Sequence, residues 1–414
     1  MKIYRESILT NGLSVITVED KSRETVSAVM WISAGSRYEK QDERGLAHLV
    51  EHMLIKETKI HPLEQLGEYI DRIGAYLNAN TSVESISIRT QTTKPHYVEM
   101  LEILAEIVTQ PIIKPKTLEN EKKIILEEIV RFNDGRGARI GVESMKLIFE
   151  NHPLSQNPLG NKECIMNATT TQLQKYYDTY ITPNRSVLII SGDIIHEDIV
   201  SLAQKYFVSS WKQGGKDIDK SKIFPTQKLG SRFVLEASNQ TQLFFNFVCP
   251  NIQLRELAML ELIANTLGYG RVPILKQELR HKEGLIYAAG ANISKFRDAA
   301  LFYISTATTR PKEVIENVKH ILAKLDDLYN NEEKFREFKE QFKNVLTRKI
   351  TSQKEEIELL WILKKLTGRL IEPQEMIQII DSLTYNDITA LIKKFLSPNN
   401  LFITAFGEKD PFTE

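Results

Sequence analysis

Two histidines and a glutamate stand close together in the segment His48-Leu49-Val50-Glu51-His52, and all three side chain types can serve a metal ion. The apolar residues around them recur at helical spacing and are Leu46, Leu49, Val50, Met53 and Leu54. On a helix, residues four apart lie on one face, so His48 and His52 can reach the same ion. Imidazole nitrogens bind zinc at about 2.0–2.1 Å. The segment therefore predicts a zinc-binding helix.

Glu51 lies next to the second histidine, where a hydrolytic site needs its general base. The order His-x-x-Glu-His is the inverted form of the more common His-Glu-x-x-His zinc motif. The alternative is an ordinary helix whose polar face meets water. Apolar residues surround the three side chains, and burying them without a ligand or partner would be costly. We therefore favour the metal site.

A third ligand is needed, because catalytic zinc usually takes three protein ligands and leaves one position open. The stretch 118–130 has a helical pattern and offers Glu121 and Glu128. These residues are seven apart, which is about two turns, so they share a helix face. Such an acidic helix is more often a solvated surface. Composition alone leaves the choice of ligand open.

Strands and a further helix are expected around this metal helix. Leu13–Val18 and Val26–Ile32 have strand patterns and precede it, and a helical segment covers Leu63–Ile73. The stretch Ser85–Arg89 alternates like a strand. A strand near the metal could bind an extended peptide as an additional strand, or could simply be one more member of the sheet. The sequence favours neither alternative.

The chain repeats itself. Pro183-Asn184 is followed nine residues after the proline by Gly192, and Pro398-Asn399 is followed at the same spacing by Gly407, with an apolar strand pattern in each interval. Self-similarity of this kind indicates a duplicated structural unit. We expect an N-terminal domain over 1–211 with the zinc site, a polar linker over 212–225, and a homologous C-terminal domain over 226–414 without zinc.

Composition excludes several classes of protein. The 54 basic and 54 acidic residues balance, so no nucleic-acid-binding surface is expected. Only Cys164 and Cys249 are present, which fits a reducing compartment and excludes a multi-cysteine zinc site. The N-terminal residues lack a secretory signal, and no apolar stretch is long enough for a membrane span. We expect a soluble, cytoplasmic protein with no membrane partner.

The zinc motif and the segments around it resemble the pitrilysin, insulinase and mitochondrial processing peptidase family of zinc endopeptidases. Glu128 follows His52 by 76 residues (128 − 52), as in that family. Further matching segments are Asn11-Gly12-Leu13, 34–39, 77–81, His152-Pro153-Leu154 and Leu159-Gly160. The resemblance implies an α+β fold of two homologous domains, each a mainly antiparallel sheet flanked by helices, which together form half of a clamshell.

The resemblance also implies roles for particular residues. His48, His52 and Glu128 would hold Zn²⁺, Glu51 would activate water, and Glu121 would support the site. Residues implied to bind the peptide substrate are Asn78, Ala79, Arg280 and Tyr287. From the sequence alone, Arg280 and Tyr287 could equally be a surface arginine at a helix end and a strand tyrosine.

The expected activity is hydrolysis of unfolded peptides inside a chamber closed by two chains, most simply a homodimer. The alternatives are the catalytic subunit of an obligate heterodimer and a non-catalytic scaffold subunit. Relatives that have become scaffolds usually lose the zinc residues, and this chain keeps all four.

Overall fold

The structure is a computed structural model that describes residues 2–211 and 229–413. The described residues form two compact units. The first contains 2–142, 153–211 and 353–361, and the second contains 143–152, 229–352 and 362–413. The predicted linker, 212–225, lies outside the described residues.

The first unit contains a six-stranded sheet in the order β1-β2-β6-β3-β5-β4. The strands are β1 (Ile3–Ile8), β2 (Ser14–Glu19), β3 (Thr25–Ile32), β4 (Tyr76–Thr81), β5 (Ile86–Thr93) and β6 (Ser186–Gly192). Every pair is antiparallel except β2 with β6. The strands expected near the N-terminus and around Ser85 are therefore confirmed as β2, β3 and β5, with ends shifted by a few residues.

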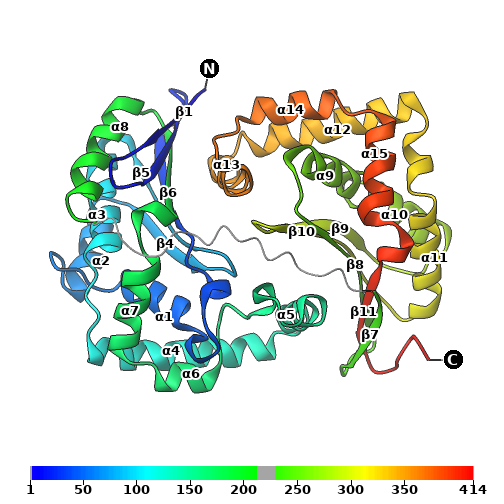
Figure 1. Ribbon diagram of the computed structural model, residues 1–414, viewed down its shortest axis with the longest axis horizontal. Helices are drawn as coiled ribbons and strands as arrows, with labels where there is room; N and C mark the ends of the chain where they lie inside the picture. Colours follow the sequence, from blue (N-terminus) through cyan, green and yellow to red (C-terminus); the bar gives the residue numbers. More distant parts are fainter. Residues whose placement is uncertain (1, 212–228, 414) are drawn as a thin grey trace. The chain divides into compact units, whose positions relative to one another are not determined.

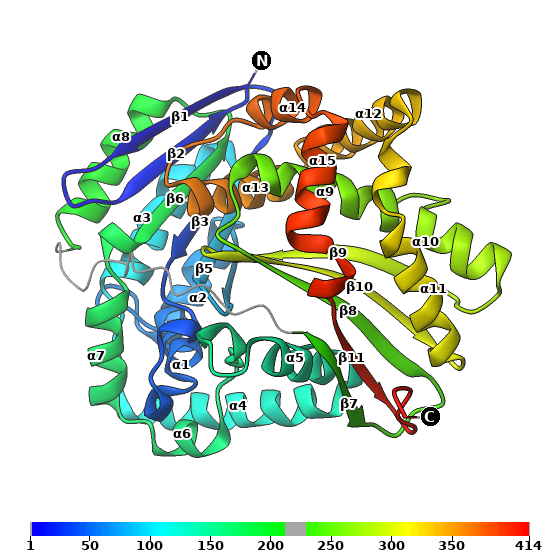
Figure 2. The same ribbon diagram turned by 45° about the vertical axis from the view of Figure 1, so that its right-hand side comes forward.

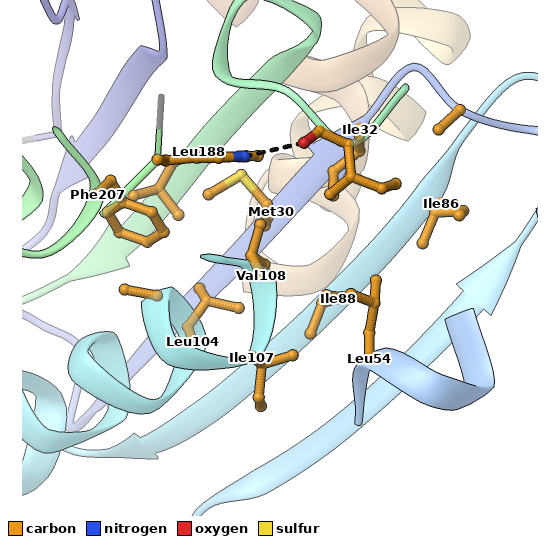
Figure 3. Close-up of a cluster of buried hydrophobic side chains, with 14 of the residues drawn as sticks. Met30, Ile32, Leu54, Ile86, Ile88, Leu104, Ile107, Val108, Leu188 and Phe207 are labelled. Carbon is orange, nitrogen blue, oxygen red and sulfur yellow. Dashed lines mark hydrogen bonds between the residues drawn. The ribbon is translucent and has the colours of Figure 1, made fainter. Parts of the chain in front are cut away.

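Helices surround this sheet: α1 (Leu46–Leu54), α2 (Leu63–Arg72), α3 (Tyr97–Thr109), α4 (Pro115–Asp134), α6 (Lys162–Asn167), α7 (Thr170–Tyr180) and α8 (His196–Ala203). Figure 3 shows apolar side chains of α1 and α3, such as Leu54 and Leu104, meeting those of β3 and β5, such as Met30 and Ile88. Alternate residues of each strand enter this core because strand side chains alternate between the two faces. The core holds α1 against the sheet.

The second unit repeats this topology in a five-stranded sheet, ordered β7-β11-β8-β10-β9. Its strands are β7 (Gly230–Leu235), β8 (Thr241–Pro250), β9 (Ala289–Lys295), β10 (Ala299–Thr308) and β11 (Phe402–Gly407). β6 and β11 occupy equivalent places, since each pairs parallel with one neighbour and antiparallel with the other. The strands on which the predicted duplication rests are therefore equivalent in the structure, and the α+β fold class is confirmed.

The helices of the second unit are α9 (Leu254–Gly268), α10 (Ile274–Lys276), α11 (Pro311–Ala323), α12 (Glu332–Lys349), α14 (Pro373–Asp381) and α15 (Tyr385–Leu391). α9 packs against β9 and β10 (Figure 2). α5 (Arg136–Phe149) and α13 (Gln353–Thr367) each contribute residues to both units. Among the helices of the described ranges, none combines the length and apolar character that crossing a bilayer requires.

The segment 353–361 comes from the C-terminal half of the chain but belongs to the first unit. The buried amide of Gln353 accepts hydrogen bonds from Ser27 Oγ at 2.9 Å and Gln91 Nε2 at 3.2 Å, and donates to the carbonyl of Ser191 at 2.7 Å. The rings of Trp31 and Trp361 stack, with centroids 5.0 Å apart. The start of α13 thus covers the sheet face opposite the core of Figure 3.

Candidate metal centre

α1 is a nine-residue helix that is buried along almost its whole length. Leu46, Leu49, Val50, Met53 and Leu54 enter the core of the first unit. The helix lies between α4 and α7 (Figure 1). Because the apolar residues fix the rotation of α1 about its axis, the histidines must face α4.

The start of α1 is fixed by the carboxyl group of Glu39 and by two glycines. Glu39 accepts hydrogen bonds from the backbone N–H groups of Gly45 at 3.1 Å and Ala47 at 2.8 Å. Burial raises the pKa of Glu39 to about 8, although these two donors oppose the rise. Gly45 has a φ of 103°, and a Cβ on Gly160 would lie 2.3 Å from the Gly45 Cα. Both positions therefore require glycine.

Three donor atoms converge between α1 and α4. His48 Nε2 lies 3.2 Å from His52 Nε2 and 3.5 Å from Glu128 Oε2, and His52 Nε2 lies 3.9 Å from the same oxygen. Ligands about 2.0–2.1 Å from a tetrahedral zinc ion are separated by about 3.3 Å. Within the described ranges, this is the one cluster of His, Cys, Asp or Glu side chains with metal-site geometry. The donor set fits a zinc ion.

His52 presents its Nε2 atom to the donor cluster for a physical reason. His52 Nδ1 lies 2.9 Å from Glu121 Oε2, so Nδ1 carries the proton and Nε2 keeps its lone pair. Lys56 Nζ lies 3.0 Å from the other Glu121 oxygen. Burial would raise the pKa of Glu121, but the hydrogen bonds from His52 and Lys56 lower it. Glu121 is therefore a buried anion that orients the imidazole ring of His52.

The protonation states differ between the two rings. Burial lowers the pKa of His48 to about 4, and the neighbouring His52 makes a smaller contribution in the same direction. Burial would also lower the pKa of His52, but the Glu121 hydrogen bond and the nearby carboxylates raise it. A neutral His48 has a lone pair available for a metal ion. The nearby carboxylates favour the charged form of His52, and a cation bound at the donor cluster would displace the proton from its Nε2.

Glu51 is buried beside the donor cluster, with Oε2 3.9 Å from His48 Nε2. The Thr81 hydroxyl donates a 2.9 Å hydrogen bond to Oε2. Burial raises the pKa of Glu51, while His52 and the Thr81 hydrogen bond oppose the rise. A carboxylate with a raised pKa next to a metal is suited to accept a proton from water.

β4 lies at the edge of the sheet and carries Asn78 and Ala79. Asn78 is exposed and points to the face opposite Ala79, which packs against the core. β5, the strand predicted around Ser85, is an interior strand. Of β4 and β5, the strand with an edge open to an added peptide is therefore β4.

Arg280 and Tyr287 lie in the second unit. The Arg280 guanidinium lies 4.9 Å from the centre of the Tyr287 ring, and Tyr287 is 77% exposed. Gly284, between them, has a φ of 63° and donates its N–H to the Arg280 carbonyl, as a helix stop does. The half-buried Arg280 and the exposed Tyr287 therefore form one pair.

Sequence reasoning missed three residues that shape the metal centre: Glu39, Lys56 and Thr81. Lys56 and Thr81 act on Glu121 and Glu51, which are distant in the chain, and Glu39 binds backbone N–H groups of the following turn. None of the three belongs to a periodic pattern with its partner. The only available signal was that all three fall in or beside the segments that resemble the family.

Comparison with known proteins places the chain in a family. Residues 14–160 match the model of the insulinase family, peptidase family M16, and residues 167–342 match the model described as the peptidase M16 inactive domain. A Rickettsia felis protein named as an uncharacterized zinc protease is 30% identical over 400 residues, covering 95% of each chain. The beta subunit of the Neurospora crassa mitochondrial-processing peptidase is 24% identical over 430 residues, covering 96% of this chain and 87% of that protein.

Solved structures agree on the fold. A protease from Helicobacter pylori superposes with a TM-score of 0.87 at 20% identity, over 98% of this chain and all of that one. A Pseudomonas fluorescens structure described as a peptidase M16 inactive domain also gives 0.87, at 18% identity, over 99% of this chain and 98% of that one. The chain belongs to the insulinase family, peptidase family M16, as the sequence resemblance predicted.

Proposed function

We propose that this protein is a zinc-dependent endopeptidase that cleaves extended peptides, with Zn²⁺ held by His48, His52 and Glu128. The convergence of three donor atoms beside a buried carboxylate supports this proposal most directly. The 30% identity to the Rickettsia felis protein that is named as an uncharacterized zinc protease supports the proposal independently.

A bound zinc ion would polarise the scissile carbonyl and acidify the attacking water. Glu51 would accept the proton of that water and return it to the leaving amine. Thr81 holds Oε2 of Glu51, so the carboxylate is oriented before substrate arrives. Glu121 would keep the proton of His52 on Nδ1 and direct Nε2 to the metal.

The free edge of β4 would hold the peptide in an extended conformation, with Asn78 and Ala79 in the pairing strand. Such binding uses backbone hydrogen bonds and requires an unfolded substrate. Arg280 and Tyr287 of each chain would contact the substrate bound at the zinc site of a second chain. We further propose a homodimeric chamber, in which each chain completes the site of the other, and a heterodimer as the alternative assembly.

The test is cleavage of a mixed peptide library by the purified protein. A chelator should abolish cleavage, and added zinc should restore it. Glu51→Gln should retain about one equivalent of zinc and lose about 10²–10⁴-fold in kcat, because the base is lost and the ligands remain. Glu127→Gln, the same change at an exposed position of α4, should behave like the wild type. Full activity of Glu51→Gln would refute its role, and an inactive wild type with bound zinc would favour a scaffold.

A further inference from the structure

A hollow of about 470 Å³ opens on the first sheet beside its free edge. It lies on the sheet face covered by the start of α13, opposite α1. Tyr76, Asn78 and Asn80 of β4 line it, whereas Leu77 of the same strand packs into the core. The full lining is Ser27, Trp31, Tyr76, Asn78, Ala79, Asn80, Ser87, Arg89, Gln91, Lys354 and Glu358, and all of these residues belong to the first unit.

The hollow carries an excess of positive charge. Its charged residues are Arg89, Lys354 and Glu358, which gives two cations and one carboxylate. Arg89 Nη2 binds Glu358 Oε1 at 2.9 Å, so these two charges balance. Lys354 is exposed and forms no ion pair within the described ranges. Its ammonium group therefore leaves one net positive charge in the hollow.

The remaining lining can bind polar side chains. Asn78 and Asn80 offer amide donors that are exposed on β4, and Ser87 offers a hydroxyl. Trp31 forms a rigid part of the wall because its ring stacks on Trp361, and its Nε1 is buried without a hydrogen-bond partner. This lining supplies several donors for a carboxylate.

We propose that this hollow is a substrate subsite that selects acidic side chains, Asp or Glu, of a peptide paired with β4. The proposal rests on the peptidase function proposed above. Lys354 supplies the unbalanced charge, and the amides of Asn78 and Asn80 supply hydrogen bonds. We call the residues that line this hollow the β4 subsite.

The geometry also fixes a positional pattern. Successive side chains of an extended peptide point to opposite faces of the sheet. Those on one face approach Thr81, which binds the catalytic Glu51, and those on the other face enter the β4 subsite. The preference for an acidic residue should therefore occur at alternate positions of the peptide, and should be absent at the positions between them.

The experiment uses full-length Glu51→Gln protein loaded with zinc, so that binding is measured without cleavage. A host peptide cleaved by the wild type is substituted with Glu, Gln or Lys at each position, and binding is measured by calorimetry. At subsite positions Glu should bind about two- to fivefold more tightly than Lys, as for partly exposed ion pairs. Adding Lys354→Glu should reverse this order, and Lys354→Gln should abolish it. Lys116→Glu, at an exposed position of α4, should leave it unchanged.

The outcomes separate the subsite from the peptidase function. If peptides are cleaved and bound with no preference for charge, the subsite alone is overturned. The same holds if Lys354→Glu leaves the preference for Glu intact. If no host peptide is cleaved, the same series is run on a library peptide that binds. Binding with the alternating preference, without cleavage by the wild type, would overturn the peptidase function and support the subsite. Absence of all peptide binding would overturn both.

Discussion

Oε2 of Glu121 lies 2.9 Å from Nδ1 of His52, so a carboxylate on α4 orients a ring on α1 whose other nitrogen faces Glu128. The two glutamates of α4 therefore have different surroundings. Glu121 is 4% exposed and hydrogen-bonded, whereas the Glu128 side chain is 35% exposed and reaches the donor cluster.

Replacing these glutamates should have unequal effects on metal affinity. Glu121→Gln should weaken zinc binding about 10–100-fold, because the amide no longer supplies the charge that favours a proton on His52 Nδ1. Glu128→Gln should weaken it much more, since a ligand anion is lost. Competition with a chromophoric chelator measures both, and Glu127→Gln on the same helix is the control. Equal and small effects would mean that the third ligand is another residue.

Glu39 should make stability depend on pH. Burial raises its pKa to about 8 from a usual value of 4.5, so the folded protein holds this proton more tightly than the unfolded chain. The stabilisation is complete below about pH 4.5 and is lost as the pH rises towards 8. The free energy of unfolding of the wild type should therefore fall, relative to Glu39→Gln, by up to about 1.4 kcal/mol per pH unit in this window.

Urea unfolding of both proteins at pH 5.5, 6.5 and 7.5, in the metal-free form, checks this prediction. Groups other than Glu39 titrate in both proteins, so their contributions cancel in the difference. Parallel pH profiles for the two proteins would contradict the assigned burial of a protonated carboxyl.

Gln353 should be required for the stability of the first unit. Its amide accepts from Ser27 and Gln91 and donates to the Ser191 carbonyl. Gln353→Ala removes a hydrogen-bond partner from the buried Ser27 hydroxyl and from the carbonyl of the buried Ser191, at a cost of about 2–3 kcal/mol in the free energy of unfolding. Lys354→Ala, one residue further along α13, removes an exposed side chain and should cost less than about 0.5 kcal/mol. Equal costs for the two variants would show that residue 353 does not hold α13 on the sheet.

Completion of the site by a second copy predicts complementation. Homodimers of Glu51→Gln or of Arg280→Ala should each be nearly inactive. When the two proteins exchange subunits, about half of the dimers are mixed, and each mixed dimer has one intact site. About a quarter of wild-type activity should return, measured as peptide cleavage after exchange is verified with labelled subunits. A mixture no more active than the average of its parents would exclude completion in trans.

The sequence alone was sufficient to predict those helices and strands that are specified by patterns of neighbouring residues. The positions of His48, Glu51 and His52 on one helix follow from the 3.6-residue period, which depends only on neighbouring residues. The duplication was visible because both copies keep the same turn and strand pattern at the same spacing. These features do not depend on how distant segments pack.

Tertiary structure alone decided the relationships between distant segments. Glu121 and Glu128 have the same local pattern, and only the packing of α4 on α1 brings Glu128 Oε2 to 3.5 Å from His48 Nε2 and leaves Glu121 beside Nδ1 of His52. The assignment of residues 353–361 to the first unit was equally hidden, because Gln353 finds its partners more than 160 positions away in the chain. Such contacts depend on which faces of helices and strands become buried against each other. The periodic pattern of one element in the sequence carries no information about the element that it packs against.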